Sequence, residues 1–209
     1  MTKNIILIGG GGLGREIFTW FNSVDQGGIN IKGFLDTKVS DLEKYKIKLP
    51  YLGDEDIYSF SKDDYVVITI SDIQVRNKIY MKLKNKVNFA NLVHPTSIIA
   101  DNISLGQGNI ICPNCIISNN VKIGNNNLFN INSSICHDSI VKNNVIMAPY
   151  SVINGNCTIN DDVFLGSHST VFQNSILEDK VLVEANTLVK GNIPSKTYIC
   201  GVPGRSFPR

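Results

Sequence analysis

An apolar residue recurs at every sixth position from residue 99 to residue 189 of this 209-residue chain. The chain is 43% hydrophobic, so sixteen matches in one chosen frame have a chance probability of about one in a million. A period of six residues fits neither a helix nor a hairpin, but it fits short strands that turn a corner once per repeat. Three repeats per turn predict a triangular β-helix of about five turns. Its interior is lined by what we call the inner ladder: Ile99, Leu105, Ile111, Ile117, Ile123, Phe129, Ile135, Val141, Met147, Ile153, Ile159, Leu165, Val171, Leu177, Val183 and Val189.

Residues beside the inner ladder predict how the coils turn. Two places before each ladder residue the sequence mostly has a small or β-branched residue, which suits a second inward-facing column. Directly after several ladder residues it has glycine or asparagine, which tolerate a positive φ. We therefore expect left-handed corner conformations at Gly106, Gly124, Asn130, Asn154, Asn160 and Gly166.

The first 93 residues follow a different pattern. An apolar run at residues 4–8 stops at a glycine-rich turn, residues 9–14, and apolar residues at helical spacing follow it. Further apolar runs cover residues 31–35 and 65–70, and a second helix is expected over 75–83. This order predicts an α/β domain with a small, mostly parallel sheet over residues 1–93, and its glycine turn is of the Rossmann-like kind. The β-helix domain and a C-terminal tail then cover residues 94–209.

Composition narrows the class of protein. The formal net charge is +2, and lysines and arginines form no stripe, so nucleic acid is not expected as a partner. No apolar run reaches the length of a membrane span, and the N-terminus lacks a cleavage pattern, so we expect a cytoplasmic protein. Five cysteines, an odd number, favour reduced thiols over a disulfide framework.

Both halves together resemble the left-handed β-helix acyltransferases, specifically the bacterial nucleotide-sugar acyltransferases related to sialic acid O-acetyltransferases. Besides the hexapeptide repeats, the resemblance is carried by the glycine turn at 8–14, Phe34-Leu35-Asp36, Arg76 within 71–76, His94-Pro95, His137-Asp138, Ala148-Pro149 and Gly201-Val202-Pro203-Gly204. It covers nearly the whole chain. It implies a homotrimer with active sites between subunits and acetyl-CoA as acyl donor.

Amide formation from an amine and a thioester needs a base to collect the released proton. Histidine, with a reference pKa near 6.5, suits that task. Among the three histidines, the resemblance selects His137 as general base, with Asp138 holding its ring in one tautomer. Composition alone would favour an ordinary solvated histidine at a corner. His94 is expected to join the domains, and His168 to lie at the surface or in the cofactor groove.

Two further catalytic residues come from the resemblance. Gly155 matches a glycine whose N–H contacts the thioester carbonyl, although a plain turn glycine would give the same sequence. Asn130 aligns with an asparagine near the active site. We expect Asn130, His137 and Gly155 to lie within a few coils of one another.

The acyl donor should lie in a groove between two β-helices. The resemblance implies contacts with coenzyme A from Ile146, Gly155, Ser167 and Ala185. Lys190 and Arg205 are candidates for its phosphates, although ordinary surface charge is the slightly favoured explanation of both.

The glycine turn fits the dinucleotide pattern Gly9-x-Gly11-x-x-Gly14, with Asp36 about twenty residues on. Alone, this pattern would suggest an NAD-dependent oxidoreductase, but the domain is too short for a second mononucleotide half. The resemblance implies that the turn takes the pyrophosphate of a nucleotide sugar. Related proteins often have an acid at position 37 and a glycine at position 71. The expected substrate contacts are Gly11, Gly12, Leu13, Asp36, Thr37 and Ser71.

Two cysteine patterns suggest other chemistry. Cys112 and Cys115 form a C-x-x-C without a second pair at metal-binding spacing, so no metal site is expected. Cys136 beside His137 raises the alternative of an acyl-enzyme. A corner role explains Cys136 as well, and direct attack on the thioester needs no covalent intermediate.

The leading hypothesis is an acetyl-CoA-dependent N-acetyltransferase acting on the C4 amine of a nucleotide-linked 4-amino-4,6-dideoxyhexose, for surface polysaccharide such as O-antigen and lipopolysaccharide, or for glycan synthesis. By resemblance, the dTDP-linked glucose derivative is the first candidate and the UDP-linked analogue the second. One alternative is an O-acetyltransferase acting on a sugar hydroxyl, as in sialic acid. Another is a non-catalytic β-helix binding protein in which His137 and Asp138 are incidental.

Overall fold

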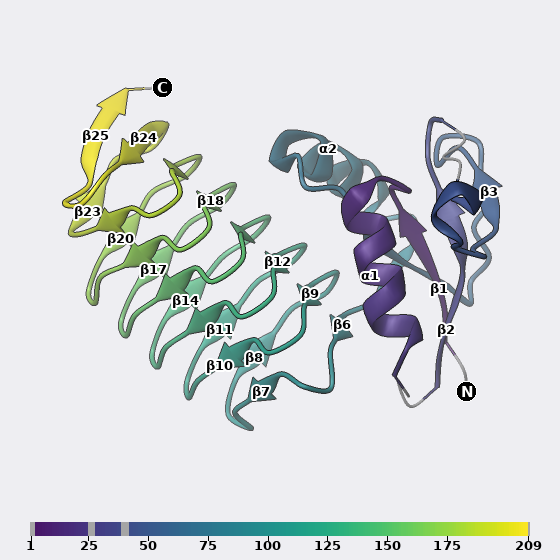
Figure 1. Ribbon diagram of the computed structural model, residues 1–209, viewed down its shortest axis with the longest axis horizontal. Coiled ribbons are helices and arrows are strands. Elements are labelled where there is room, and N and C mark those ends of the chain that lie inside the picture. The colour runs from purple at the N-terminus through teal and green to yellow at the C-terminus, as the bar shows by residue number, and fades with distance from the viewer. Residues whose placement is uncertain (1–2, 25–27, 39–41, 209) are drawn as a thin grey trace. The chain divides into compact units, whose positions relative to one another are not determined.

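The computed structural model describes residues 3–24, 28–38 and 42–208. The chain divides into two compact units, Met1–Leu92 and Val93–Arg209. In the first, helices and strands alternate, and the second is built from short strands (Figure 1). Neither of the two described α-helices has the length and apolar character of a membrane span.

A five-stranded parallel sheet forms the first unit, in the order β3-β2-β1-β4-β5. This order is that of a Rossmann-like sheet, as predicted. The short strands β3 and β5 extend the sheet beyond the three predicted strands. The elements are β1 (Lys3–Ile8), α1 (Gly12–Asn22), β2 (Ile29–Leu35), the 3-10 turn η1 (Glu43–Tyr45), β3 (Tyr51–Gly53), β4 (Asp64–Ile68), α2 (Ile73–Leu83) and β5 (Asn88–Phe89).

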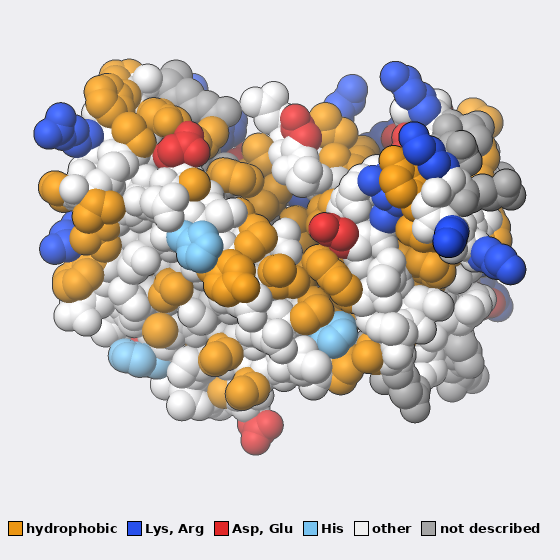
Figure 2. Space-filling model, in the orientation of Figure 1, with side chains coloured by type: hydrophobic (Ala, Val, Ile, Leu, Met, Phe, Trp, Pro, Cys, Tyr) orange, Lys and Arg blue, Asp and Glu red, His pale blue; other side chains and the backbone are white. Residues whose placement is uncertain are grey.

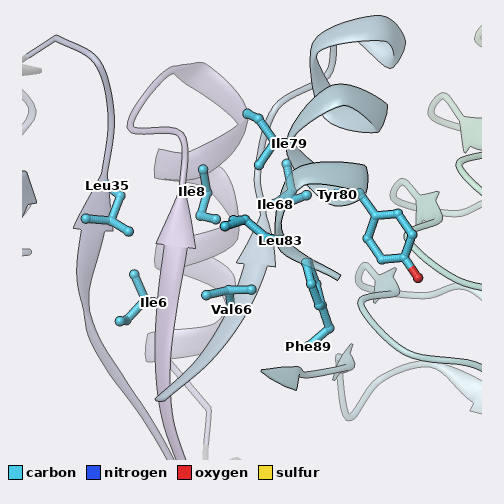
Figure 3. Packing of buried hydrophobic residues seen from close by; sticks show 9 residues of the cluster. All are labelled: Ile6, Ile8, Leu35, Val66, Ile68, Ile79, Tyr80, Leu83 and Phe89. Atoms are coloured by element: carbon cyan, nitrogen blue, oxygen red, sulfur yellow. The ribbon is translucent and has the colours of Figure 1, made fainter. Parts of the chain in front are cut away.

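The core of this unit lies between the sheet and α2 (Figure 3). Alternate residues of the central strands face the helix, and Tyr80 meets Phe89 edge to face at 5.0 Å between ring centroids. The residues between them on β1 and β4 are buried as well, so both faces of the central strands are covered. That explains why these strands are continuous apolar runs in the sequence. The cluster comprises Ile6, Ile8, Leu35, Val66, Ile68, Ile79, Tyr80, Leu83 and Phe89.

Three parallel sheets form the faces of the β-helix, as predicted. The first six-stranded face, which we call face A, comprises β7 (Ile98–Ile99), β10 (Ile116–Ile117), β13 (Ser134–Ile135), β16 (Val152–Ile153), β19 (Thr170–Val171) and β22 (Leu188–Val189). Face B, also six-stranded, comprises β8 (Ser104–Leu105), β11 (Lys122–Ile123), β14 (Ile140–Val141), β17 (Thr158–Ile159), β20 (Ile176–Leu177) and β23 (Asn192–Ile193). Face C is eight-stranded, with β6 (Leu92–Val93), β9 (Ile110–Ile111), β12 (Leu128–Phe129), β15 (Ile146–Met147), β18 (Phe164–Leu165), β21 (Leu182–Val183), β24 (Thr197–Cys200) and the antiparallel β25 (Arg205–Pro208).

The inner ladder fills the β-helix as predicted. From Ile111 to Val189 every ladder residue is buried, with exposed fractions of 4% or less, while Ile99 and Leu105 at the first coil are half-buried. The β-helix has six coils, against the five predicted, because β6, β23 and β24 add strands before and after the sixteen ladder positions. Outside, the β-helix face seen in Figure 2 carries mainly apolar and uncharged side chains, with isolated charged groups between them.

The prediction for the corner residues was wrong. From Leu105 to Val183, the left-handed residues lie three places after the ladder residue, not one, and Gly106, Gly124 and Gly166 do not have a positive φ. These glycines instead allow neighbouring coils to approach closely. A Cβ at Gly124, for example, would lie 2.6 Å from the Asn143 Oδ1 of the next coil. The left-handed positions are Asn114, Asn120, Asn126, Asn132, Asp138, Asn144, Tyr150, Asn156, Asp162, His168, Asn174, Lys180 and Asn186.

Gly124→Ala tests this reassignment. We expect it to destabilise the β-helix by about 1–3 kcal/mol, because the added carbon overpacks the contact between coils. Urea unfolding followed by circular dichroism measures the change. The control is Asn174→Gly, which keeps a left-handed position and should change the unfolding free energy by less than about 0.5 kcal/mol. Equal stability of Gly124→Ala and the unaltered protein would contradict the steric explanation.

Candidate functional site

His137 and Asp138 form a hydrogen-bonded pair at the corner that follows face A. The His137 Nδ1 lies 2.7 Å from the Asp138 Oδ2, and both side chains are exposed. Neighbouring side chains on an extended strand point to opposite sides. Here Asp138 has a φ of 60°, so the left-handed corner turns its carboxylate back toward the imidazole. The fold thus supplies the geometry that a histidine held in one tautomer requires.

Asp138 is an ionised carboxylate in this arrangement. The hydrogen bond with His137, followed by one from the Asn120 side chain at 3.0 Å, holds the pKa of Asp138 below its usual range. In a neutral imidazole, a carboxylate that accepts from Nδ1–H leaves the lone pair on Nε2. A nitrogen in that state can accept a proton from a substrate.

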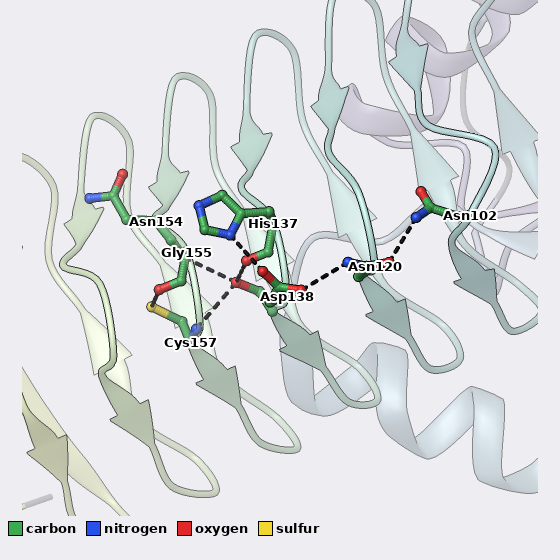
Figure 4. A network of polar contacts seen from close by, with 8 residues as sticks. Asn102, Asn120, His137, Asp138, Asn154, Gly155 and Cys157 are labelled. Atoms are coloured by element: carbon green, nitrogen blue, oxygen red, sulfur yellow. Dashed lines mark hydrogen bonds and ion pairs between the residues drawn. The ribbon is translucent and has the colours of Figure 1, made fainter.

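Gly155 lies one coil beyond His137, beside its imidazole (Figure 4). A Cβ at residue 155 would come within 2.7 Å of the His137 Cε1 and 2.8 Å of its Nε2. A larger residue here would push the ring from its observed position, whereas the φ of Gly155 is not in the left-handed region and needs no glycine. The structure brings Gly155 and His137 together, and it leaves the Nε2 side of the ring next to glycine backbone.

Asn130 lies at a different corner of the same chain. It directly follows β12 of face C, whereas His137 follows β13 of face A. The Asn130 Oδ1 accepts a hydrogen bond from the Ile131 N–H at 2.7 Å. Three of the four residues implied for coenzyme A also belong to face C: Ile146 lies in β15, while Ser167 and Ala185 follow β18 and β21. The fourth, Gly155, follows β16 of face A. Within one chain, His137 and Gly155 therefore lie at a different corner of the β-helix from the other expected residues.

The glycine turn joins β1 to α1. Gly9 has a φ of 112°, and a Cβ at Gly14 would lie 2.1 Å from the Gly9 carbonyl oxygen, so both glycines are needed for packing of the turn. Gly11, at the N-cap of α1, has a φ of −70°, and a Cβ there would meet no atom within 4 Å. Neither strain nor crowding inside the chain therefore explains the glycine at position 11.

The N-terminus of α1 is suited to an anion. No side chain caps this helix, and its first turn has no acidic residue. Gly12 and Leu13 are its first residues, and the Arg15 guanidinium lies 3.9 Å from where a Cβ on Gly12 would be. Unbonded N–H groups at a helix N-terminus bind phosphate groups well. Arg15, which stacks on the Tyr45 ring at 3.9 Å, was missed from the sequence because it was assigned only to the helix pattern.

A pocket of about 280 Å³ opens at the carboxyl ends of β1 and β2, beside α2. Asp36 and Thr37 line it, and the Asp36 Oδ2 accepts a hydrogen bond of 2.8 Å from the Gly10 N–H. Gly11, Gly12, Leu13 and Ser71 are not among its lining residues, although Ser71 comes directly before Asp72, the N-cap of α2. The position matches the place where parallel α/β sheets bind ligands.

Two lysines of α2 also line this pocket, Lys78 and Lys82, and sequence reasoning missed them. Lys82 forms an ion pair with Asp56. The lysines are four residues apart, with Val75 and Ile79 on the same side of the helix. That four-residue spacing was the sequence signal that could have pointed to these lysines. The same spacing is also typical of an ordinary solvent-exposed helix face.

The remaining histidines and cysteines have other surroundings. His94 is buried with its Nδ1 2.9 Å from the Thr96 hydroxyl, and exposed His168 stacks on Tyr150 at 4.8 Å. Cys112 and Cys115 are buried, and burial raises the pKa of the Cys115 thiol. A thiol kept protonated is a poor metal ligand. Cys136 is half-buried, and its N–H bonds the Ile153 carbonyl within the coil stack.

The chain is similar to known proteins in sequence over its first unit and in fold over both units. Residues 4–83 match the family model of the PglD N-terminal domain. No curated protein sequence matches the chain significantly. The resemblance drawn from the sequence is confirmed for the N-terminal domain by this match, and for the two-domain fold by solved structures.

Three solved structures share that fold over nearly their whole lengths. The acetyltransferase domain of PglB from Neisseria gonorrhoeae is 17% identical, with a TM-score of 0.88 over 99% of this chain and 100% of that one. A variant of perosamine N-acetyltransferase from Caulobacter crescentus, in complex with CoA and GDP-perosamine, is 19% identical, with a TM-score of 0.85 over 100% and 99%. WeeI from Acinetobacter baumannii AYE is 24% identical, with a TM-score of 0.83 over 99% and 100%.

Gly155→Ala tests the contact between coils at this site. The added carbon should displace the His137 ring and weaken its hydrogen bond to Asp138, because no space remains beside Cε1. The Hε1 and ring ¹⁵N signals of His137 in NMR spectra report the movement. Gly11→Ala, whose added carbon meets open space, is the control and should leave these signals in place. Unchanged His137 signals in folded Gly155→Ala would show that the site is looser than described.

Proposed function

We propose that this protein is an N-acetyltransferase that moves the acetyl group of acetyl-CoA to the amine of a nucleotide-linked amino sugar. The single observation that carries the proposal is the exposed His137, bonded to Asp138 and packed against Gly155. Support also comes from the PglD N-terminal domain match and from the fold shared with acetyltransferases.

His137 acts as the general base in this proposal. The substrate amine attacks the thioester carbon, and the His137 Nε2 takes the proton that the amine gives up. Asp138 keeps the Nδ1 of the ring protonated and stabilises the imidazolium that forms. The tetrahedral intermediate then expels the CoA thiolate, which receives that proton, so the products are an amide and free CoA. The Gly155 N–H is proposed as a donor to the carbonyl oxygen during this step.

The nucleotide half of the substrate is proposed to bind the first unit. Its pyrophosphate would lie at the N-terminus of α1, where Gly11 and Gly12 leave room for close approach and Arg15 adds positive charge. Asp36 and Thr37 would contact the base or ribose in the neighbouring pocket. Ser71, at the start of α2, is proposed to contact the substrate as well.

We also propose a homotrimer. His137 and Gly155 lie at the corner after face A, whereas Asn130, Ile146, Ser167 and Ala185 belong to face C. If these residues serve one reaction, the face C of a neighbouring copy has to meet the His137 corner. Coenzyme A would then bind between two copies, and three copies give three equivalent sites.

Candidate acceptors are dTDP-4-amino-4,6-dideoxyglucose first and its UDP-linked analogue second, with a cytoplasmic role in surface polysaccharide synthesis. Because one similar structure holds GDP-perosamine, this sugar nucleotide also belongs in any assay. The second candidate function, acetylation of a sugar hydroxyl, would use the same base.

Release of free CoA thiol from acetyl-CoA, measured with each amino sugar and with sialic acid, tests the function. We expect turnover with one amino sugar, and a loss of at least about a hundredfold in His137→Ala, because proton transfer loses its base. CoA binding by calorimetry should persist in this variant, which shows that it is folded. Turnover with sialic acid alone would establish O-acetylation. Full turnover in His137→Ala would show that His137 and Asp138 have no catalytic role.

The acid side of the pH profile tests the state of Asp138. Its pKa is held below the usual range by the bonds from His137 and Asn120, so Asp138 stays ionised and does not titrate near neutral pH. We therefore expect log kcat/KM to fall toward acid pH with the same slope in the unaltered protein and in Asp138→Asn. The value of kcat/KM itself should be lower in the variant. A slope that decreases by one in Asp138→Asn would show that Asp138 itself titrates.

A further inference from the structure

Asp138 ends a column of side-chain amides that runs along the corner of the β-helix. The Asn102 Nδ2 donates to the Asn120 Oδ1 at 2.7 Å, and the Asn120 Nδ2 donates to the Asp138 Oδ1 at 3.0 Å. Each step spans 18 residues, which is one coil, so the three residues occupy equivalent places in successive coils. Figure 4 shows the column leading to the imidazole of His137.

The charge of Asp138 fixes the direction of every bond in this column. An ionised carboxylate only accepts hydrogen bonds, so Asn120 has to present its NH₂ group to Asp138. Its oxygen then faces Asn102, which has to present an NH₂ group in turn. The two Asp138 oxygens are thereby used separately, Oδ1 by Asn120 and Oδ2 by His137.

A second amide column shows what such contacts do elsewhere in the fold. At another corner the Asn126 Nδ2 donates to the Asn144 Oδ1 at 3.0 Å, and the Asn144 Nδ2 donates to the Asp162 Oδ1 at 2.7 Å. Asn126 and Asn144 are buried, so that column stabilises the stack. Asn102 and Asn120 are exposed, where water competes for each hydrogen bond, and their contribution to stability is small.

We propose that Asn120 is a positioning residue, which holds the Asp138 carboxylate in the orientation that keeps the proton of His137 on Nδ1. Asn102 supports it by holding the amide of Asn120 in place. This inference rests on the proposed function of His137 as a base, because only that function needs an unprotonated Nε2. Without Asn120, the exposed carboxylate can rotate away, and the imidazole then samples both tautomers.

The test measures the tautomer directly and needs no substrate. The ring ¹⁵N shifts of neutral His137 give the fraction protonated on Nδ1. Asn120→Gly removes the amide while keeping the left-handed backbone without strain, and we expect the Nδ1-protonated fraction to fall about twofold or more. Asn120→Asp keeps the size of the side chain but only accepts hydrogen bonds, so it should lower this fraction as well.

The matched control is Asn174→Gly, an exposed left-handed residue two coils beyond Asp138, which should leave the tautomer unchanged. Retention of the native tautomer in both Asn120 variants, at unchanged melting temperature, would overturn the proposal. If the chain does transfer acetyl groups, Asn120→Gly should lower kcat and leave the KM for the sugar unchanged. A protein without acetyl transfer still gives the tautomer result, so failure of the proposed function and failure of the positioning role are distinguishable.

Discussion

The register between coils is the constraint on which the site depends. Parallel pairing sets Ser134 against Val152 and Ile135 against Ile153, and the same offset of 18 residues is kept between successive coils through most of the β-helix. Each place in the 18-residue coil therefore becomes a column. His137 and Gly155 meet because they share one column, and Asn120 reaches Asp138 because they share another. A two-residue slip in one coil would separate both pairs.

Close contact between coils decides which residues the corners accept. Glycine is needed where the next coil approaches, as at Gly124, and a left-handed residue is needed three places after the ladder. The second requirement is met at residue 138 by aspartate, and its conformation brings two adjacent side chains together. The proposed site lies at an exposed corner because the interior is filled by the apolar ladder.

The sequence predicted the fold well because the repeat and the glycine turn are local patterns. The corner conformations were predicted wrongly. Glycine occurs both where a neighbouring coil approaches closely and where the backbone has a positive φ, and the sequence does not distinguish these two cases. The short strands β3 and β5 carried too few residues to show a pattern. For the site, the pair of His137 and Asp138 was chosen by resemblance, but the contact needed the corner geometry. The sequence did not single out Arg15, Lys78 and Asn120, because the residues around each of them come together only in the folded chain.

The proposed function requires that the His137 corner of one copy and face C of another form one acetyl-transfer site. A crystal structure with bound CoA and a nucleotide-linked amino sugar tests this requirement. We expect the CoA sulfur and the sugar amine beside the His137 Nε2 and the Gly155 N–H, with the rest of CoA along face C of a neighbouring copy. CoA bound within a single copy, away from His137, would contradict it.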